Sequence, residues 1–401
     1  YASSYDGPNY ANSVGYGISP VYNTNPGATY SDKINNPSLK PNSTEQIEIG
    51  AELNLFKNRF SADVTYFTSN DGPRIFNRDL SSTTGYTSAI VNGIKTQKMG
   101  LEITLKGTPI KSENLRWDIL LNYSNFKETL QEVYNENGVK IEQLPRNYFV
   151  SGNSGSQFIN VGERIDQVFV STFQRTLDGQ IINDAGGRPL VNGLGTQVGF
   201  ANPDFVWGLN NRVSYKNWSL SFQFDGRVGG VIEDYIRRQT FRGGRNIETV
   251  EGALGIARDF DTQGIKSYIG EGVRISEGSP TFNSTTGAIT NYDKLKFVAN
   301  DIKTYAQDYV SRYNSTAEGN LMSKTFSKLR EVTLSYNFPS DLLQKTFIKQ
   351  ASVSLVGRNL FYFIDSKHSG VDLDQYTGLN ASTGLQTPTM KRFGINLNLT
   401  F

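Results

Sequence analysis

The chain ends in Thr389-Met-Lys-Arg-Phe-Gly-Ile-Asn-Leu-Asn-Leu-Thr-Phe401, and this stretch decides the fold. From Phe393 to Phe401 every second residue is apolar, with Gly, Asn and Thr between them. A period of two predicts a strand with one apolar face and one polar face. The apolar face must be covered either by a second sheet, as in a soluble sandwich, or by lipid.

The composition favours lipid as the cover. Only 37% of the 401 residues are hydrophobic, the mean hydropathy is −0.43, and no stretch approaches the roughly 18 apolar residues of a transmembrane helix. The chain has 24 Phe, 21 Tyr and 39 Gly, which suits many short amphipathic strands with polar loops and argues against a compact helical enzyme. The net charge of +2 implies no bulk electrostatic partner such as nucleic acid.

Nine segments alternate in the same way as the C-terminus, and each is about nine to thirteen residues long, the length of a tilted strand that crosses a bilayer. Their apolar rows lie within residues 47–55, 60–66, 99–105, 115–123, 205–215, 218–224, 326–336, 351–361 and 393–401. This pattern predicts an all-β, antiparallel transmembrane β-barrel, in which the apolar rows face lipid and the intervening residues face the lumen.

The connections between these segments alternate between short and long. The long ones cover about 69–93, 128–203, 227–323 and 362–388, and barrels of this class place long loops outside the cell and tight turns in the periplasm. Residues 1–42 would then form a further extracellular loop, before barrel strands within 43–401. Because bacterial single-chain barrels have an even number of strands, we expect the C-terminal portion of a larger barrel, whose missing part carries the signal peptide.

Several motifs resemble those of SusC/RagA-type TonB-dependent transporters. They span residues 36–401 in order and include Asn36-Pro-Ser-Leu-Lys-Pro-Asn-Ser-Thr-Glu-Gln-Ile-Glu-Ile-Gly50, Val161-Gly-Glu-Arg-Ile165, Asn202-Pro-Asp-Phe-Val-Trp-Gly-Leu-Asn-Asn211, Phe326-Ser-Lys-Leu-Arg-Glu-Val-Thr-Leu-Ser-Tyr-Asn-Phe-Pro339 and Gly370-Val-Asp372. Two departures are Arg164 and Leu373, since the family usually has proline at each position. Phe393 and the terminal Phe401 are candidates for the barrel-assembly signal.

The resemblance implies energised import of glycans or peptides across the outer membrane of a Bacteroidota-type bacterium. The family has a 22-stranded barrel around an N-terminal plug, a TonB-binding segment before the plug, and a SusD-like surface lipoprotein as a lid. Neither the plug domain nor the TonB segment is visible in this sequence, so contact with the TonB complex would come through the missing N-terminal part. Two alternatives stay open: a structural or docking barrel in a larger outer-membrane assembly, and a passive porin.

Two groups of residues are candidates for contact with cargo or partner. Lumen-facing candidates opposite the apolar rows are Asp63, Arg116, Asp118 and Glu331, although any one of them could simply solvate the wall or pack against a plug. In the long 227–323 loop, aromatic rings could stack on sugars or on a protein partner, or form the core of the loop itself. The candidates there are Tyr235, Arg238, Phe241, Arg242, Tyr268 and Tyr292.

Alternation within 326–336 predicts that Lys328 and Arg330 share the outward face with Phe326 and Val332, where they could pair with lipopolysaccharide phosphates, unless a bulge turns them inward. Outer-membrane lipid and lipopolysaccharide are therefore expected partners.

Catalysis and metal binding have little support. The chain has no Cys and a single His, His368, so a hydrolytic triad has one possible base, in a loop expected to be mobile. Asp365, Asp372 and Asp374 flank it, and loop carboxylates of this kind are more often solvated than metal ligands. We therefore expect neither an enzyme nor a cofactor.

Overall fold

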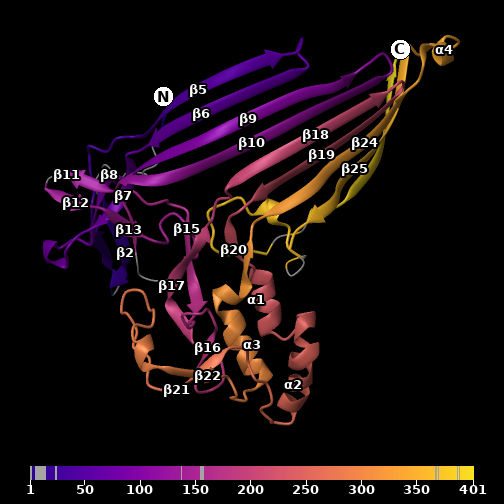
Figure 1. The fold of residues 1–401 in the computed structure, drawn as a ribbon. Helices are drawn as coiled ribbons and strands as arrows, with labels where there is room; N and C mark the ends of the chain where they lie inside the picture. Colours follow the sequence, from indigo (N-terminus) through magenta and orange to yellow (C-terminus); the bar gives the residue numbers. More distant parts are fainter. Residues whose placement is uncertain are drawn as a thin grey trace.

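A computed structural model describes residues 2–4, 15–22, 25–136, 138–153, 158–365, 368, 370–385, 387 and 389–401. Its main feature is an antiparallel sheet in the order β1-β5-β6-β9-β10-β18-β19-β24-β25-β26, with long strands that lie side by side (Figure 1). Apart from the short β1, Ala2–Ser4, these are β5 Asn42–Leu55, β6 Phe60–Asp71, β9 Lys95–Lys111, β10 Leu115–Glu132, β18 Phe205–Tyr215, β19 Trp218–Val228, β24 Phe326–Asn337, β25 Gln350–Phe363 and β26 Arg392–Thr400. The nine long strands are the nine predicted from the alternation, and the β fold is confirmed.

The register joins the apolar rows into one continuous face. Directly paired residues share a face of the sheet, and the pairs Leu53↔Ala62, Ala62↔Leu105, Leu105↔Leu121, Leu121↔Leu209 and Leu209↔Phe224 carry one apolar row across six strands. Many side chains of this face are exposed: Ile49 is 72%, Leu53 56% and Ile395 75% accessible, whereas the small Ala62 is buried. Exposed aliphatic rows of this extent suit contact with hydrocarbon.

Short turns and long connections leave the sheet at opposite ends. The turn after β5 places Phe56, Lys57 and Asn58 at φ angles of 53°, 57° and 64°, and Lys216 in the turn after β18 has a φ of 49°. These turns lie along the upper edge of the sheet in Figure 1, at the end that also holds helix α4, Ser340–Leu343, and the C-terminus, whereas the long connections lie to the left and below. Trp218 and Tyr336 pair across strands at this end, with ring centroids 4.7 Å apart.

A β-bulge in β24 corrects one sequence prediction. The pairing of β24 slips by one residue between Leu329 and Glu331, so Leu329 faces outward beside Phe224 and Phe361. Residues before the bulge therefore reverse their faces: Phe326, Lys328 and Arg330 point inward. The prediction that Lys328 and Arg330 lie on the outward face, near lipopolysaccharide phosphates, is wrong.

The long connections fold into compact layers of their own. Small sheets form from β2 Tyr16–Tyr22, β3 Asn25–Tyr30, β4 Lys33–Ile34, β7 Arg74–Asp79, β8 Ser88–Gly93, β11 Tyr134–Glu136, β12 Val139–Ile141, β13 Gln143–Pro145, β14 Phe158–Asn160, β15 Gln167–Phe173, β16 Ile182–Asn183, β17 Val191–Phe200, β20 Val231–Glu233, β21 Val273–Glu277, β22 Lys296–Ala299 and β23 Leu321–Ser323. Residues 231–323, which we call the outer subdomain, also hold helices α1 Tyr235–Arg242, α2 Gly252–Thr262 and α3 Ala306–Ser315.

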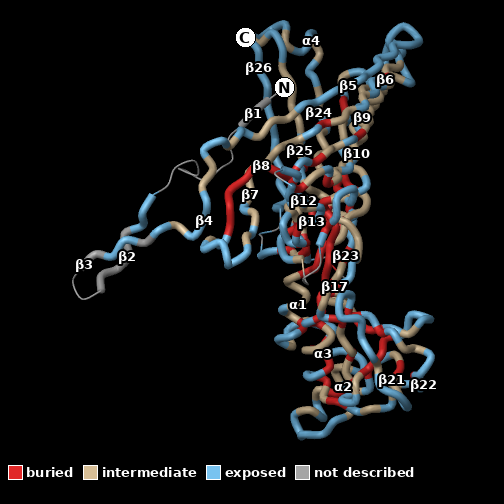
Figure 2. The backbone as a smooth tube through the Cα atoms, turned by 90° about the vertical axis from the view of Figure 1, so that its left-hand side faces the viewer, coloured by how far each residue is buried: buried red, intermediate tan, exposed pale blue. Residues whose placement is uncertain are grey.

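The buried core lies mainly in these outer segments and at the adjoining ends of the long strands (Figure 2). One cluster centres on the fully buried Ile94, Leu130 and Ile159, and another joins Ile232 and Met322 to Leu373. The outer segments are therefore held by hydrophobic packing, while the sheet leaves its apolar face open to the membrane.

Candidate functional site

The predicted lumen residues lie on the polar face of the sheet, opposite the apolar rows. Asp118 accepts hydrogen bonds from Arg116 and Thr108, each at 2.7 Å. Glu331 accepts one from Arg358, also at 2.7 Å. Asp63 pairs in register with Thr104 and is exposed, and it forms no ion pair with any residue that the structure describes. Asp118 and Glu331 are thus already paired with arginines of the wall, whereas Asp63 is not.

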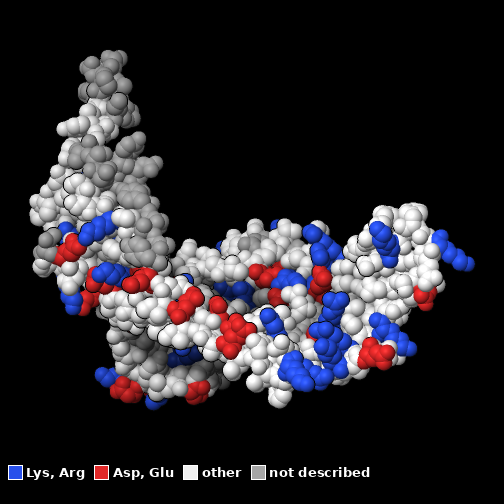
Figure 3. All heavy atoms as spheres, turned by 90° about the horizontal axis from the view of Figure 1, so that it is seen from above, with Lys and Arg blue, Asp and Glu red and all other residues white. Residues whose placement is uncertain are grey.

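At the end of the molecule that holds the short turns, Lys and Arg side chains gather, whereas both signs mix over the middle (Figure 3). The turn regions of the sequence contribute Lys57, Arg59, Lys111, Lys345 and Lys349. A hollow of about 400 Å³ on the polar face at this end is lined by Arg59, Lys106, Arg116 and Arg212.

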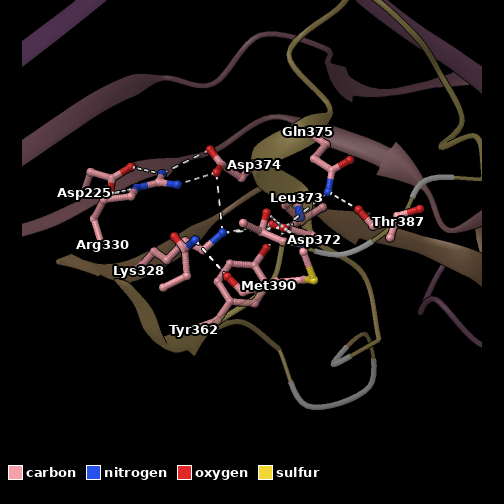
Figure 4. Close-up of polar contacts among 12 residues, drawn as sticks. Asp225, Lys328, Arg330, Tyr362, Asp372, Leu373, Asp374, Gln375, Thr387 and Met390 are labelled. Atoms are coloured by element: carbon pink, nitrogen blue, oxygen red, sulfur yellow. Dashed lines mark hydrogen bonds and ion pairs between the residues drawn. The ribbon is translucent and has the colours of Figure 1, made fainter. Parts of the chain in front are cut away.

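The inward-turned cations of β24 fasten the last long connection to the wall. Lys328 Nζ lies 3.4 Å from Asp372 and 3.5 Å from Asp374, and Arg330 Nη1 lies 2.6 Å from Asp374. Arg330 Nε also donates to Asp225 of β19 at 2.7 Å. We call these five residues the loop anchor; Figure 4 shows them converging from two strands and the connection.

Hydrogen bonds and ion pairs favour the charged forms of Asp372 and Asp374. The side chain of Lys328 is 4% exposed and that of Asp372 is 8% exposed. Hydrogen bonds from Arg330 lower the pKa of Asp374. Burial raises the pKa of Asp372, but hydrogen bonds from Thr389 and the charge of Lys328 outweigh it, so the net shift is downward. The expectation that Asp372 and Asp374 are solvated loop carboxylates is wrong, because they neutralise buried cations.

Two further buried cations lie beside the loop anchor and donate to backbone carbonyls. Arg227 donates to the carbonyls of Lys324 at 3.0 Å and Tyr376 at 3.1 Å, and also to that of Leu373. Lys324 Nζ donates to the carbonyl of Ala201 at 2.8 Å. Burial and the charge of Arg227 lower the pKa of Lys324 to about 8.

His368 is a structural residue rather than a mobile base. It is 6% exposed, and its Nδ1 lies 3.0 Å from Asp234 Oδ2. Asp234 also accepts the N–H of Arg237 at the start of α1, so the pair ties the last connection to the outer subdomain. Among the residues that the structure describes, no group of three or more His, Cys, Asp or Glu side chains could hold a metal ion.

The six outer-loop candidates do not converge on one surface. Phe241 is 5% exposed, Tyr268 packs on Tyr309 at 4.8 Å between ring centroids, and the Tyr292 hydroxyl donates to the carbonyl of Arg175 at 2.9 Å. These three rings pack within the outer segments, which is the second of the two interpretations that the sequence left open. Tyr235 and Arg238 begin α1, where Arg238 pairs with Glu233 at 3.0 Å. The side chain of Arg242 is exposed.

Sequence reasoning missed Asp225, Arg227, Lys324 and Asp234. Each makes at least one contact with a residue about 90 or more positions away in the chain, and no local period marks them. The one available signal was the pair of cations at Lys328 and Arg330 in an otherwise apolar row.

No helix within the described residues is long and apolar enough to span a membrane.

Comparison with known proteins agrees with this architecture. TonB-dependent receptor P3 of Formosa agariphila is 22% identical over 394 residues, which cover 91% of this chain and 35% of that protein. TonB-dependent receptor P26 of the same organism is 23% identical over 347 residues, covering 82% and 31%. The chain thus spans about a third of the length of these relatives.

Solved structures show the same fold. The structure of the RagAB peptide transporter matches 98% of this chain and 39% of the other, with a TM-score of 0.64 and 18% identity. The RagAB peptide importer in its open-open state matches 98% and 38%, with a TM-score of 0.65 and 16% identity. The family model described as TonB dependent receptor-like, beta-barrel, matches residues 1–222, more than half of the chain. The chain therefore belongs to the TonB-dependent receptor β-barrel family of the outer membrane.

Proposed function

We propose that this chain forms part of the wall and the outer loops of a TonB-dependent, SusC-like importer that takes up a glycan or a peptide. The observation that carries the proposal is the fold match to RagAB over 98% of the chain, which takes in the outer segments as well as the sheet. RagAB is described as a peptide transporter. The polar, charged inner face supports passage of a hydrophilic cargo.

Uptake in the native organism tests this proposal. The gene is inactivated, and uptake of labelled glycan and peptide mixtures is measured with and without the proton-motive force. We expect the inactivated strain to lose uptake of one cargo class, and uptake of that class by the wild type should need the proton-motive force. Uptake that continues unchanged when that force is dissipated would favour the passive porin instead.

The proposed partners are a SusD-like surface lipoprotein and, through polypeptide beyond this chain, the TonB complex. Apolar side chains on the outer subdomain support a docked protein, because Ile247 is 66%, Val250 53%, Ile256 65% and Phe260 39% exposed. They lie on or next to α2, far from the short turns (Figure 1). We assign the exposed Arg242 to the same contact, and lipid and lipopolysaccharide to the outward face of the sheet.

A docking barrel within a larger assembly is the second candidate, and the same exposed apolar residues are compatible with it. Gentle purification from native membranes separates the two. Co-purification of one SusD-like lipoprotein supports import, whereas a large secretion or barrel-assembly complex supports docking.

A further inference from the structure

A recess opens on the inner face beneath the last long connection, and the sequence pattern did not indicate it. Its volume is about 430 Å³. The floor is a row of directly paired residues on β9, β10, β18 and β19: Thr104, Asn122, Gly208 and Asp225. Asp374 and Thr377 of the last connection line it from the other side.

Gly208 gives the recess its depth. A Cβ placed at this position would have only one neighbour within 4 Å among the described residues, the carbonyl oxygen of Phe224 at 4.0 Å. Its φ does not lie in the left-handed region, so the backbone does not require glycine. A larger side chain would therefore occupy the recess without straining the sheet.

The surrounding groups are held in place before any ligand arrives. The Thr104 hydroxyl donates to Asn122 Oδ1 at 3.1 Å. Arg330 Nε donates to Asp225 Oδ1 at 2.7 Å, and its Nη1 donates to Asp374 Oδ2 at 2.6 Å. The loop anchor therefore fixes both carboxylates and the last long connection. Fixed polar groups bind with a smaller loss of conformational entropy than mobile ones.

The groups that line the recess are mainly hydrogen-bond acceptors. Arg227 contributes to the lining, but its guanidinium donates to backbone carbonyls. Glu102 adds a carboxylate that forms no ion pair with a described residue. Ser124 and Thr377 add hydroxyls that donate and accept. Arg330 already neutralises Asp225 and Asp374, so Glu102 supplies the uncompensated negative charge of the lining. A fitting ligand must supply donors and carry no negative charge.

We propose that this recess is a binding subsite for a neutral, hydroxyl-bearing saccharide segment of the imported cargo, which rests on the proposed import function. Sugar hydroxyls can donate to the carboxylates and accept from the hydroxyls at once. A peptide backbone supplies only one N–H donor per residue, fewer than a sugar ring with several hydroxyls. A sulfated or uronate sugar would meet Glu102 with like charge.

The test uses the complete transporter purified in detergent. Isothermal titration calorimetry measures its affinity for a panel of neutral oligosaccharides. Gly208→Val fills the recess. Gly394→Val is the matched control, because Gly394 lies on the inner face of β26 and a Cβ added there would meet no described atom within 4 Å. We expect Gly208→Val to weaken binding by about tenfold or more and Gly394→Val to leave it unchanged. Asn122→Ala should weaken it in the same direction.

Parallel titrations with sulfated oligosaccharides and with peptides complete the test. Equal binding by the wild type and Gly208→Val overturns the subsite, as does preference for either of these ligand classes. Uptake in cells separates this failure from failure of the proposed function. If Gly208→Val and Asn122→Ala both retain energised import of neutral glycan, only the subsite is rejected. If the wild type shows no energised import, the proposed import function is rejected.

Discussion

At the scale of single residues, Lys328 shows how a buried cation can hold a loop. Its ammonium lies between Asp372 and Asp374 with 4% of the side chain exposed, and it also lies 5.3 Å from the centroid of the Tyr362 ring. Removing one partner of a buried pair leaves an uncompensated charge, which is far costlier than the loss of a surface pair.

Lys328→Met should therefore loosen the last connection. Methionine keeps the packing on Tyr362 but leaves Asp372 without its cation, at an expected cost of about 3–5 kcal/mol. Hydrogen exchange of residues 371–376 measures the loss of protection. The control is Arg358→Gln, which removes the exposed pair to Glu331 (57% and 35% exposed side chains) and should cost about 0–1 kcal/mol. Equal protection in the two variants would contradict the role given to the loop anchor.

Lys324 makes stability depend on pH. Its folded pKa of about 8 lies below the ordinary 10.5, so between these values the unfolded chain binds a proton that the folded chain has lost. Stability should rise as the pH increases through this window, and Lys324→Met should lack that rise. Thermal unfolding in detergent at pH 7 and pH 9.5 measures the difference between the two proteins. A wild type and variant with parallel pH profiles would contradict it.

At the scale of the element, alternation predicted the strands well because bilayer and lumen impose opposite polarity on neighbouring residues. It failed in β24, where the bulge before Glu331 moved Phe326 and Lys328 to the other face without changing the composition. It also could not predict α1 to α3, because these helices are short and their apolar residues pack against segments that are distant in the sequence. His368 and Asp234, 134 positions apart, meet only in the folded chain.

Neighbouring residues of β26 give the sharpest test of its two faces. Ile395 pairs with Leu355 on the outward face, whereas Asn396 pairs with Ser354 on the inward face. Ile395→Arg should reduce the yield of heat-modifiable barrel in the membrane, since a cation on the lipid face costs about 2–4 kcal/mol near the bilayer centre. Asn396→Arg should assemble normally. Similar yields from the two variants would reject the assignment of faces.

The terminal Phe401 is proposed to act in barrel assembly, and a stacking contact complicates the test. Its ring lies 5.4 Å from that of Phe347, at an interplanar angle of 15°. Phe401→Ser should lower the amount of assembled barrel in cells, whereas Phe347→Ser removes the stack alone and should have a smaller effect. If the two variants lose assembly equally, the packing contact rather than the terminal residue is responsible.

At the scale of the whole molecule, the outer subdomain joins the sheet through β20 and β23, and it also contacts another long connection where β16 pairs with β21. β20 leaves the wall and pairs with the returning β23 through Val231↔Ser323, Ile232↔Met322 and Glu233↔Leu321. The pairing of β19 with β24, on the sheet side of that junction, uses no residue of the subdomain helices. The membrane wall and the surface platform should therefore be separable by mutation.

Replacing residues 236–316 by a short Gly/Ser linker should preserve the barrel and abolish capture of the surface partner. Asp234 and His368 stay in the chain, so their pair still ties β20 to the last connection, whereas α2 with the exposed Ile256 and Phe260 is removed. Heat-modifiability reports the barrel, and co-purified lipoprotein reports docking. The double variant Ile256→Asp and Phe260→Asp serves as the matched control, because it keeps the subdomain and should lose the partner alone. If the linker variant still retains the partner, docking uses the other outer segments, and the surface around α2 has no part in it.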